Sequence, residues 1–577
     1  MKKFLFKMMA FAMVAMLMFG ATGCGSTVVE DVDKNKVQLY IASYNGGGGY
    51  KWLDDPTNDL ADDAESRFEK KYENTRFGDK VGVQVIVESS KAFSASKVKD
   101  SLATSSYDMY FAPASYYEHV AQGEFLDITD MVTAVSDIDN KSIESKIDAS
   151  KQSLLKVNER YYALPYYDVS QGITYDADLF NENKLYFSKE MDTDGMRKFV
   201  TTKNATNLSC GPDAVYGTYD DGLPSTYQEF YKLMEQMISG RSGETIIPFA
   251  FNGHGDAEYT NMLMSAFSAN VMGIDAIKAH ASFNTAGKTI EVVTGFDNNG
   301  QPEIDNIAIT EENAYLLKSS LGMYYASELA QKIFSDTRYY DAKSASTGST
   351  NLVAMERYVK SGKDGSTPIA MLIEGSYWYN EAESEGVLER ARKLGELKNM
   401  KVMALPHQYA GTVQPKADGE TPVSQVLTTG GTYGFIAADI ASERIEAAKL
   451  FLQFCYSDEE LVKAELSNNG IGRGLNYDTT SIQGQLSSYA KSVNLMKAQA
   501  VANGTICDLT SQHPIALRAS TYFSRVQNSG YWSVVVNGAE YHTPCSAFRN
   551  GKATAKDYFL ALGISKSTWD NNYYIAK

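Results

Sequence analysis

The sequence predicts an α/β protein with more than one domain, and three observations support this prediction. Short β-branched runs alternate with amphipathic helical stretches, which is the pattern of parallel sheets with helical crossovers. The chain has 577 residues, of which 44% are apolar and 22% charged, as in a globular protein. One hydrophobic core rarely serves more than about 250–300 residues, so this length predicts two or three domains.

The first third of the chain carries the clearest alternation. Strands are expected at 37–42, 81–87 and 108–111, and helices at 61–72 and 97–103. The first helix is indicated by Ala61, Ala64, Phe68 and Tyr72, which recur at three- and four-residue spacings. In parallel sheets of this kind, ligand-binding loops lie beyond the carboxyl ends of the strands.

The later part of the chain contains further elements of the same kinds. Ser225 or Thr226 is expected to cap a helix, with Gln228 or Glu229 completing a capping box. The other expected elements are an apolar segment at 162–167 that continues through 172–175, buried strands at 368–374 and 428–436, and a long helix at 445–456. Stretches near 181–222 and 280–310 have little pattern and are interpreted as insertions.

The N-terminus has the three parts of a secretory signal. Lys2, Lys3 and Lys7 are followed by an apolar run at 8–19 and then by small residues. The run is shorter than the roughly 20 residues that cross a hydrocarbon core, so it predicts a cleaved signal rather than a membrane span.

Residues 21–24, Ala-Thr-Gly-Cys, resemble a bacterial lipobox, although Ala21 stands where Leu is more common. The resemblance implies that 1–23 is removed and that Cys24 carries lipid, including palmitate, with 24–36 as a polar tether. The alternative is ordinary signal cleavage beside an incidental cysteine.

Charge and cysteines narrow the function classes. A net charge of −17 argues against nucleic-acid binding, which depends on Lys and Arg at phosphates. The four later cysteines, Cys210, Cys455, Cys507 and Cys545, have no metal-ligand spacing, and disulfides between them remain open. The 38 tyrosines offer flat apolar faces with hydroxyls, which suit sugars and also ordinary interfaces.

Several segments, in this order, are similar to the extracellular solute-binding proteins of the carbohydrate-uptake ABC transporter family (maltose-binding-protein-like). The resemblance covers most of residues 37–560. The matching segments are the lipobox, 64–72, 107–111, 119–128, 162–166, 175–180, 370–378, 433–437 and 447–454.

The resemblance implies a type II periplasmic-binding-protein-like fold, in which two discontinuous α/β lobes close over a ligand by a hinge motion. It places lobe 1 at 37–165 plus 428–472 and lobe 2 at 166–427 plus 473–577. It also implies a monomer without enzymatic activity. Such a protein captures a carbohydrate, we expect an oligosaccharide, and delivers it to ABC permease subunits at the outer face of a bacterial membrane.

A sugar needs hydrogen-bond partners for its hydroxyls and flat apolar surface for its C–H faces. Aromatic, amide and charged side chains at the expected strand ends supply both. The candidate ligand-binding residues are Tyr44, Asn45, Trp52, Ser115, Tyr116, Tyr167, Asp168, Asn252, Asp256, Glu374, Trp378 and Arg473. By the resemblance, Trp378 is the strongest stacking candidate.

Several candidates also have a structural alternative. Trp52 and Trp378 would then be packing aromatics, Ser115 a plain helix cap, Tyr167 a buried hinge residue and Arg473 part of a surface loop. Asp213, Asp220 and Asp221 lie among turn glycines and are candidate Ca²⁺ ligands. Their spacing is not that of an EF-hand, and a solvated acidic turn is the alternative.

Two other functions are compatible with this composition. An exported glycoside hydrolase also pairs aromatics with carboxylates, but it needs two carboxyl groups about 5–9.5 Å apart across the bond, and no pair has a recognisable context. No G-x-S-x-G, H-E-x-x-H or P-loop motif is present. A binding protein for a non-sugar solute is the second alternative. The proposed activity requires no cofactor.

Overall fold

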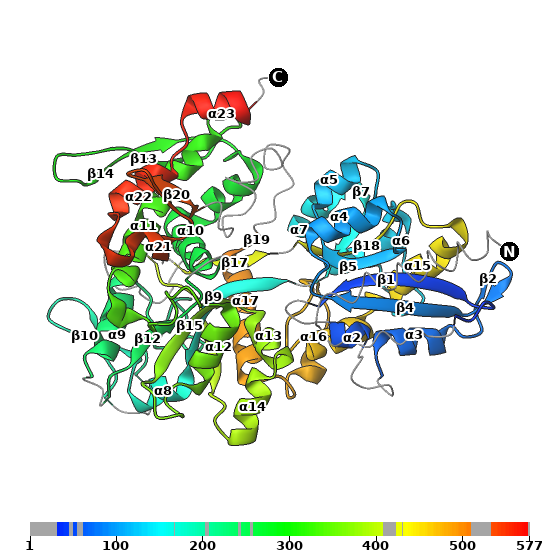
Figure 1. Ribbon diagram of the computed structural model, residues 1–577, viewed down its shortest axis with the longest axis horizontal. Helices are drawn as coiled ribbons and strands as arrows, with labels where there is room; N and C mark the ends of the chain where they lie inside the picture. Colours follow the sequence, from blue (N-terminus) through cyan, green and yellow to red (C-terminus); the bar gives the residue numbers. More distant parts are fainter. Residues whose placement is uncertain are drawn as a thin grey trace, which may run out of the picture.

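A computed structural model of the chain describes residues 32–45, 50–54, 62–166, 168–201, 207–240, 244–253, 258–407, 423–429, 431–508 and 532–574. Cys24, Tyr167 and Asp256, which were predicted to be functional, lie outside these ranges. Within these ranges the protein forms two lobes, each built around one mixed sheet (Figure 1). No helix in the described part is long and apolar enough to span a membrane.

The lobe 1 sheet contains strands from distant parts of the chain. Its order is β4 (Val83–Ser90), β1 (Val37–Tyr44), β5 (Met109–Pro113), β18 (Thr432–Ile436) and β8 (Ala163–Pro165). β1 is parallel to β4 and β5, whereas β18 is antiparallel to β5 and β8. The carboxyl ends of β1, β5 and β8 therefore lie at the same edge, which faces lobe 2.

Helices cover both faces of the lobe 1 sheet. They are α2 (Tyr50–Leu53), α3 (Ala64–Lys71), α4 (Ala95–Ala103), α5 (Tyr116–Ala121), α6 (Thr129–Thr133), α7 (Ala149–Leu155), α15 (Ser442–Cys455) and α16 (Asp458–Ser467). α3 begins one turn later than expected, because Asp63 caps it by accepting a hydrogen bond from the Ser66 N–H. Its buried residues are Ala64 and Phe68, as the spacing predicted.

The lobe 2 sheet has the order β12 (Ile247–Ala250), β15 (Ile369–Gly375), β9 (Val169–Asp176), β17 (Val426–Thr429) and β19 (Ile506–Asp508), and β16 (Met400–Met403) also pairs with β9. β9 is antiparallel to β15, β16 and β17, whereas β12 with β15 and β17 with β19 are parallel pairs.

Helices pack on both faces of this sheet as well. They are α8 (Ala177–Glu182), α9 (Tyr227–Ile238), α10 (Glu258–Ser282), α11 (Leu321–Phe334), α12 (Asn351–Lys360), α13 (Trp378–Ser384), α14 (Val387–Leu394) and α17 (Ser488–Asn503). One face buries Ile173, Phe249 and Phe267 in a core with α10, and the other buries Leu372 and Trp378 in a core with α17. Thr226 caps α9 by accepting from the Glu229 N–H.

The expected insertions contain small hairpins. The described part has β10 (Phe187–Met191) with β11 (Arg197–Phe199), and β13 (Ile290–Phe296) with β14 (Pro302–Ile307). The C-terminal region adds β20 (Val534–Val536), β21 (Ala539–Tyr541), α21 (Pro544–Phe548), α22 (Ala555–Leu562) and α23 (Lys566–Asn572) to lobe 2. The remaining short elements are β2 (Arg76–Phe77), β3 (Lys80–Val81), β6 (Lys156–Val157), β7 (Arg160–Tyr161), η1 (Glu144–Lys146), η2 (Ala314–Ser319), η3 (Thr337–Tyr339), η4 (Thr480–Ile482) and η5 (Arg549–Gly551).

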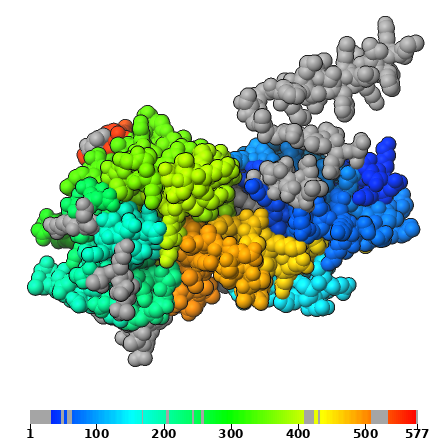
Figure 2. Space-filling model, turned by 90° about the horizontal axis from the view of Figure 1, so that it is seen from below, coloured from blue at the N-terminus to red at the C-terminus, as the bar shows by residue number. Residues whose placement is uncertain are grey.

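The described part of the chain crosses between the lobes three times. The first crossing lies between β8 and β9, and the second lies between β17 and β18. The expected single strand at 428–436 is therefore two strands in different sheets, and Thr428 belongs to lobe 2 rather than lobe 1. The third crossing follows α16, and Figure 2 shows this yellow-to-orange segment extending across the boundary between the lobes.

Candidate functional site

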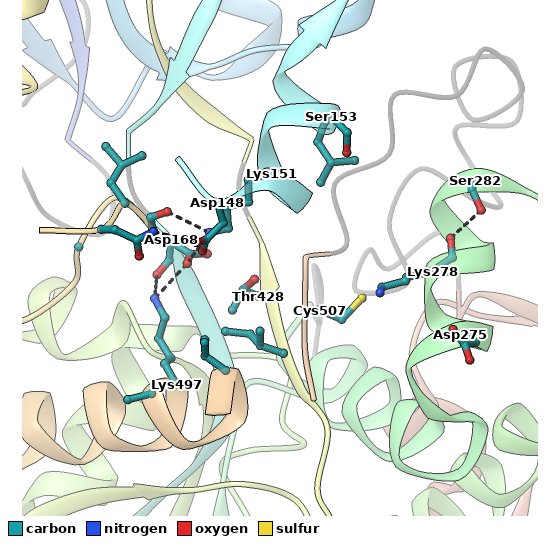
Figure 3. Close-up of a pocket in the computed structure, with 18 of the residues that line it drawn as sticks. Asp148, Lys151, Ser153, Asp168, Asp275, Lys278, Ser282, Thr428, Lys497 and Cys507 are labelled. Carbon is teal, nitrogen blue, oxygen red and sulfur yellow. Dashed lines mark hydrogen bonds and ion pairs between the residues drawn. The ribbon is translucent and has the colours of Figure 1, made fainter. Parts of the chain in front are cut away.

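A pocket of about 740 Å³ lies between the lobes (Figure 3). Lobe 1 contributes α7 and the loop at 472–477, and lobe 2 contributes the second half of α10, the loop at 284–288, α17 and β19. Asp168, in the first crossing, also lines it. The pocket is thus formed by both lobes and by a hinge segment, so its shape depends on how the lobes are arranged.

Asp168 is the centre of a charged cluster in this pocket. Its side chain is 5% exposed, and its Oδ2 atom lies 3.1 Å from the ammonium groups of both Lys151 in α7 and Lys497 in α17. Lys497 also donates to the Asp168 carbonyl oxygen at 3.0 Å. Burial acts to raise the pKa of the Asp168 carboxyl, but Lys497 and Lys151 outweigh it and lower the pKa to about 2. The carboxylate therefore joins cations from the two lobes.

The third crossing packs directly against the first. The Asp168 N–H donates to the Gly472 carbonyl oxygen at 2.9 Å. Gly474 has a φ of +66°, and a Cβ added there would lie 2.8 Å from Asp168 Oδ2 and closer still to Lys151 Nζ. Only glycine leaves room for this carboxylate and ammonium beside the backbone.

A second polar group on the pocket wall is formed by Glu465, Tyr477 and Asn494. The Tyr477 hydroxyl donates to Glu465 Oε2 at 2.6 Å, and the Asn494 amide donates to Oε1 at 3.1 Å. Burial raises the pKa of the Glu465 carboxyl. This side of the pocket therefore holds an acid whose negative charge is disfavoured.

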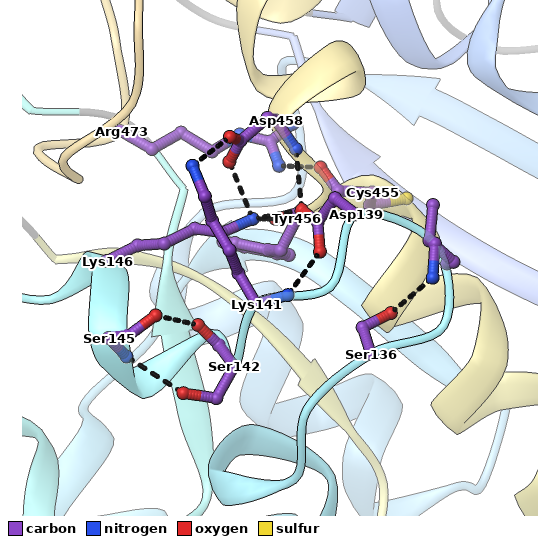
Figure 4. A network of polar contacts seen from close by, with 11 residues as sticks. Ser136, Asp139, Lys141, Ser142, Ser145, Lys146, Cys455, Tyr456, Asp458 and Arg473 are labelled. Atoms are coloured by element: carbon purple, nitrogen blue, oxygen red, sulfur yellow. Dashed lines mark hydrogen bonds and ion pairs between the residues drawn. The ribbon is translucent and has the colours of Figure 1, made fainter.

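A buried network in lobe 1 positions the loop at 472–477 (Figure 4). The Lys146 ammonium, only 2% exposed, contacts Asp139 at 2.6 Å, Asp458 at 2.9 Å and the Tyr456 carbonyl oxygen at 2.7 Å. The Lys146 carbonyl oxygen then accepts from the Asn476 N–H at 2.8 Å. The pocket loop is therefore anchored to the junction between α15 and α16.

Thr428 and two residues of α17 complete the pocket wall. Thr428 is 1% exposed, and its hydroxyl and Asp168 Oδ1 have no hydrogen-bond partner among the described residues. Buried polar atoms normally have such partners, so both atoms need one from a ligand or from water. Ala498 and Val501 add an apolar strip on which Val501 is 57% exposed.

Of the predicted ligand residues within the described ranges, Asp168 is the one that lines this pocket. Tyr44 and Asn45 lie at the carboxyl end of β1, where Asn45 Oδ1 is buried without a partner in the described part of the chain. Ser115 is exposed after β5, and its side chain caps no helix. Asn252 is 8% exposed just after β12. These four residues lie at strand ends as expected, and their contact with a ligand stays a prediction.

Three side chains that were predicted to contact the ligand are packed in the core of lobe 1 instead. Trp52 is 3% exposed, and its indole N–H donates to Glu460 at 3.0 Å. Tyr116 is 3% exposed, and its hydroxyl donates to the Leu155 carbonyl oxygen. Arg473 is 2% exposed, and its guanidinium lies 4.3 Å from the centroid of the Trp52 ring. In this structure none of these side chains is placed to meet a sugar.

Trp378 is also a core residue, which corrects the stacking prediction. It is 0% exposed, its indole N–H donates to Thr174 Oγ1 at 2.8 Å, and its ring packs against Tyr358 and Tyr489. Glu374 is 2% exposed and lies within β15 opposite Gly172. The half-buried aromatic at this strand end is Tyr377, one position earlier.

The aspartate loop does not assemble a calcium site. Asp220 Oδ2 accepts from the Asp213 N–H at 3.0 Å, and Asp221 Oδ2 accepts from the Gly217 N–H at 2.8 Å. Burial and the Asp213 charge raise the pKa of Asp220 well above its usual range, and burial raises the pKa values of Asp213 and Asp221. In the described ranges no group of three or more His, Cys, Asp or Glu side chains is arranged to hold a metal.

Sequence reasoning missed most of the pocket. Lys151, Lys497, Asn494 and Val501 lie on ordinary amphipathic helices, and no local motif distinguishes them. The segment 472–474 was predicted to contribute Arg473, whereas Gly472, Gly474 and the nearby Tyr477 line the pocket. All four later cysteines are buried thiols, and Cys507 lies on the pocket wall.

Comparison with known proteins bears on the fold. No protein-family model matches the chain, and no curated protein matches its sequence. A solved structure described as "Chitin oligosaccharide binding protein" is similar with a TM-score of 0.53 and 14% identity, covering 93% of this chain and 99% of that one. Another, described as "SBP RafE in complex with raffinose", has a TM-score of 0.51 and 12% identity, covering 92% and 99%. The predicted two-lobed α/β fold of solute-binding proteins is thereby confirmed.

Proposed function

We propose that this protein is the substrate-binding component of an ABC importer and that it captures an oligosaccharide in the interlobe pocket. The observation that carries this proposal is a pocket of about 740 Å³ lined by both lobes and by a hinge crossing. Small-ligand sites usually occupy about 300–1,000 Å³. Two proteins of similar fold are described with a chitin oligosaccharide and with raffinose, which supports a sugar as ligand.

The pocket offers both kinds of contact that a sugar needs. Asp168 Oδ1 accepts from sugar hydroxyls, and the Thr428 hydroxyl either donates or accepts. Ala498 and Val501 take the apolar C–H face of a ring. Closing of the lobes about the three crossings removes water from these contacts, and reopening releases the sugar to the permease. This is capture without bond cleavage, and it needs no cofactor.

The location in the cell is part of the proposal. Residues 1–23 act as the signal, and Cys24 carries the lipid, including palmitate, that holds a monomer at the outer face of the membrane. Replacing Cys24 with Ala should move the protein from the membrane fraction into the medium or periplasm and abolish labelling by a palmitate analogue. Unchanged membrane retention of C24A would contradict the anchor.

The sugar proposal is tested with purified protein from residue 25 onward. A thermal-shift screen of mono- and oligosaccharides, followed by calorimetry, should give saturable binding of at least one oligosaccharide. Each bound sugar is then incubated with the protein and analysed by chromatography. Intact sugar is expected, whereas cleavage products would support the glycoside hydrolase alternative. Binding only of peptides or polyamines would support a non-sugar solute.

A further inference from the structure

Four lysines line the interlobe pocket, in a protein whose net charge is −17. They are Lys151 in lobe 1 and Lys278, Lys288 and Lys497 in lobe 2. Lysines inside a cavity do not increase the solubility of a protein that already has a large negative net charge. A local function is the simpler explanation.

The buried end of the pocket holds two ammonium groups close together. Lys151 and Lys497 approach the same atom, Asp168 Oδ2, at 3.1 Å each, so two ammonium groups share one carboxylate. Their side chains are 20% and 17% exposed, which leaves both accessible from the pocket. The low pKa of Asp168 is consistent with this positive environment.

The remaining acids of the pocket have partners already. Asp148 accepts from the Asn476 amide at 2.7 Å, and Asp275 pairs with Lys288 at 2.5 Å. Glu465 accepts two hydrogen bonds and has a raised pKa. Lys288 therefore offsets Asp275 and the raised pKa disfavours a charge on Glu465, whereas the neutral Asn476 amide does not offset Asp148.

Lys278 supplies a cation on the opposite wall. It is exposed on α10 and forms no ion pair within the described part of the chain. Figure 3 shows its ammonium directed toward Cys507 and the pocket, across from Asp168. The two ends of the pocket thus present ammonium groups to a ligand lying between them.

We propose that the ligand is an acidic oligosaccharide, one that carries carboxylate or sulfate groups, and that Lys497 and Lys278 bind its negative charges. This inference rests on the proposed function and names the class of sugar. A charge-assisted hydrogen bond from ammonium to carboxylate is stronger than a neutral one, so lysines at both ends favour an acidic sugar over its neutral counterpart. Asp168 Oδ1 and Thr428 remain for the hydroxyl groups.

The test compares acidic and neutral sugars of the same size by calorimetry. Two pairs match an acidic with a neutral sugar, namely trigalacturonate with galactotriose of the same linkage and a hyaluronan tetrasaccharide with chitotetraose. A third pair compares sulfated with unsulfated chondroitin tetrasaccharide, both of which carry carboxylates. The last pair separates sulfate from carboxylate. At least one acidic member should bind about tenfold more tightly than its neutral partner, and its affinity should fall as salt is raised from about 0.05 to 0.5 M.

Three variants place the effect in the pocket. Lys497→Gln should weaken binding of the acidic sugar about tenfold and binding of a neutral sugar by less than about twofold. Lys278→Gln, at an exposed position that the fold does not need, should weaken it about threefold. The matched control is Lys232→Gln: Lys232 also contacts a carboxylate, Asp192 at 2.6 Å, and a carbonyl oxygen, but outside the pocket. It should not change affinity.

Each outcome decides a separate question. Equal affinity for acidic and neutral sugars would overturn the acidic-ligand inference and leave the proposed function intact. Tighter binding of acidic sugars that neither pocket variant changes would overturn the assignment to these lysines. Failure to bind any sugar would remove the proposed function and this inference with it.

Discussion

At the residue scale, Gly474 and Trp378 show how closely packed the surroundings of the pocket are. Gly474 combines a positive φ with a carboxylate and an ammonium at its Cα, so both backbone conformation and space exclude a side chain. Trp378 fills the α17 side of lobe 2 with its ring and satisfies its N–H at Thr174. The first residue shapes the pocket directly, whereas the second supports the sheet beneath it.

Gly474→Ala should destabilise the protein and also weaken ligand binding. Its positive φ alone costs a residue with a Cβ about 1–2 kcal/mol, and the clash at Asp168 adds to this cost. Gly300→Ala is the control, since Gly300 has a φ of +79° with nothing within 4 Å of an added Cβ. Chemical denaturation measures the free energy of unfolding of both variants. An equal loss in the two variants would contradict the packing argument.

Trp378→Ala should lower the free energy of unfolding by about 3–5 kcal/mol, because it leaves a large cavity in the core. We expect a lower melting temperature as the primary effect, measured by calorimetry. A stable variant that has lost only ligand affinity would restore the original stacking prediction.

At the element scale, α17 combines support and recognition. Tyr489, Val493, Met496 and Ala500 face the core, while Lys497, Ala498 and Val501 line the pocket. The Ser487 side chain caps its start by accepting from the Ala490 N–H. Because both the core face and the pocket face of α17 carry apolar residues, its sequence shows only a weak separation into an apolar and a polar side.

Val501→Asp should weaken sugar binding at least about fivefold with little change in stability, because it places a charge on the apolar strip of the pocket. Leu495→Asp is the control on the same helix: Leu495 is 53% exposed, similar to Val501 at 57%, but does not line the pocket. Calorimetric titration with the identified sugar measures the affinity of both variants. Equal effects of the two changes would argue that charge on α17, rather than the pocket wall, is responsible.

Elements with strong local patterns could be predicted from the sequence. The spacing of Ala64 and Phe68 and the β-branched run in β4 gave the correct element types, because burial on one side produces these periodicities. The prediction of a single strand at 428–436 was wrong, because two short apolar strands that follow one another have the same sequence pattern as one longer strand. Nothing in the local pattern shows that β17 and β18 belong to different sheets.

The candidate site was less predictable for a physical reason. Asp168 follows an apolar strand and precedes another, so its place at a crossing was visible. Lys497 meets it only through the packing of α17, far along the chain. Trp52 and Trp378 suggested stacking surfaces, but large aromatic rings gain more by full burial, and the sequence alone does not distinguish the two uses.

At the scale of the whole molecule, surface and buried contacts hold the lobes together. Lys91 after β4 pairs with Glu385 after α13, and both side chains are largely exposed. The Asn380 amide donates to the Asn468 carbonyl oxygen at 2.8 Å. Exposed ion pairs contribute about 0–1 kcal/mol, so the Lys91–Glu385 pair permits opening of the lobes.

Acid should reduce stability through buried histidine. Burial lowers the pKa of His407 to about 4, whereas an unfolded histidine has a pKa near 6.5. Above about pH 6.5 His407 is neutral in both the folded and the unfolded state, so it does not affect the free energy of unfolding. As the pH falls from 6.5 toward 4, the unfolded state binds a proton at this histidine and the folded state does not, so the free energy of unfolding decreases. Relative to wild type, His407→Gln should show a smaller loss of unfolding free energy over this range. Parallel pH profiles would contradict this assignment.

The position of β18 has a consequence for how the chain folds. It lies in the lobe 1 sheet between β5 and β8, yet residues 166–431 separate it from β8 along the chain. Lobe 1 therefore cannot complete its sheet until the part of lobe 2 from β9 to β17 has been synthesised, and pairing over such long sequence separation is slow. For the exported protein that we propose, a first lobe that stays incomplete would keep the chain competent to cross the membrane.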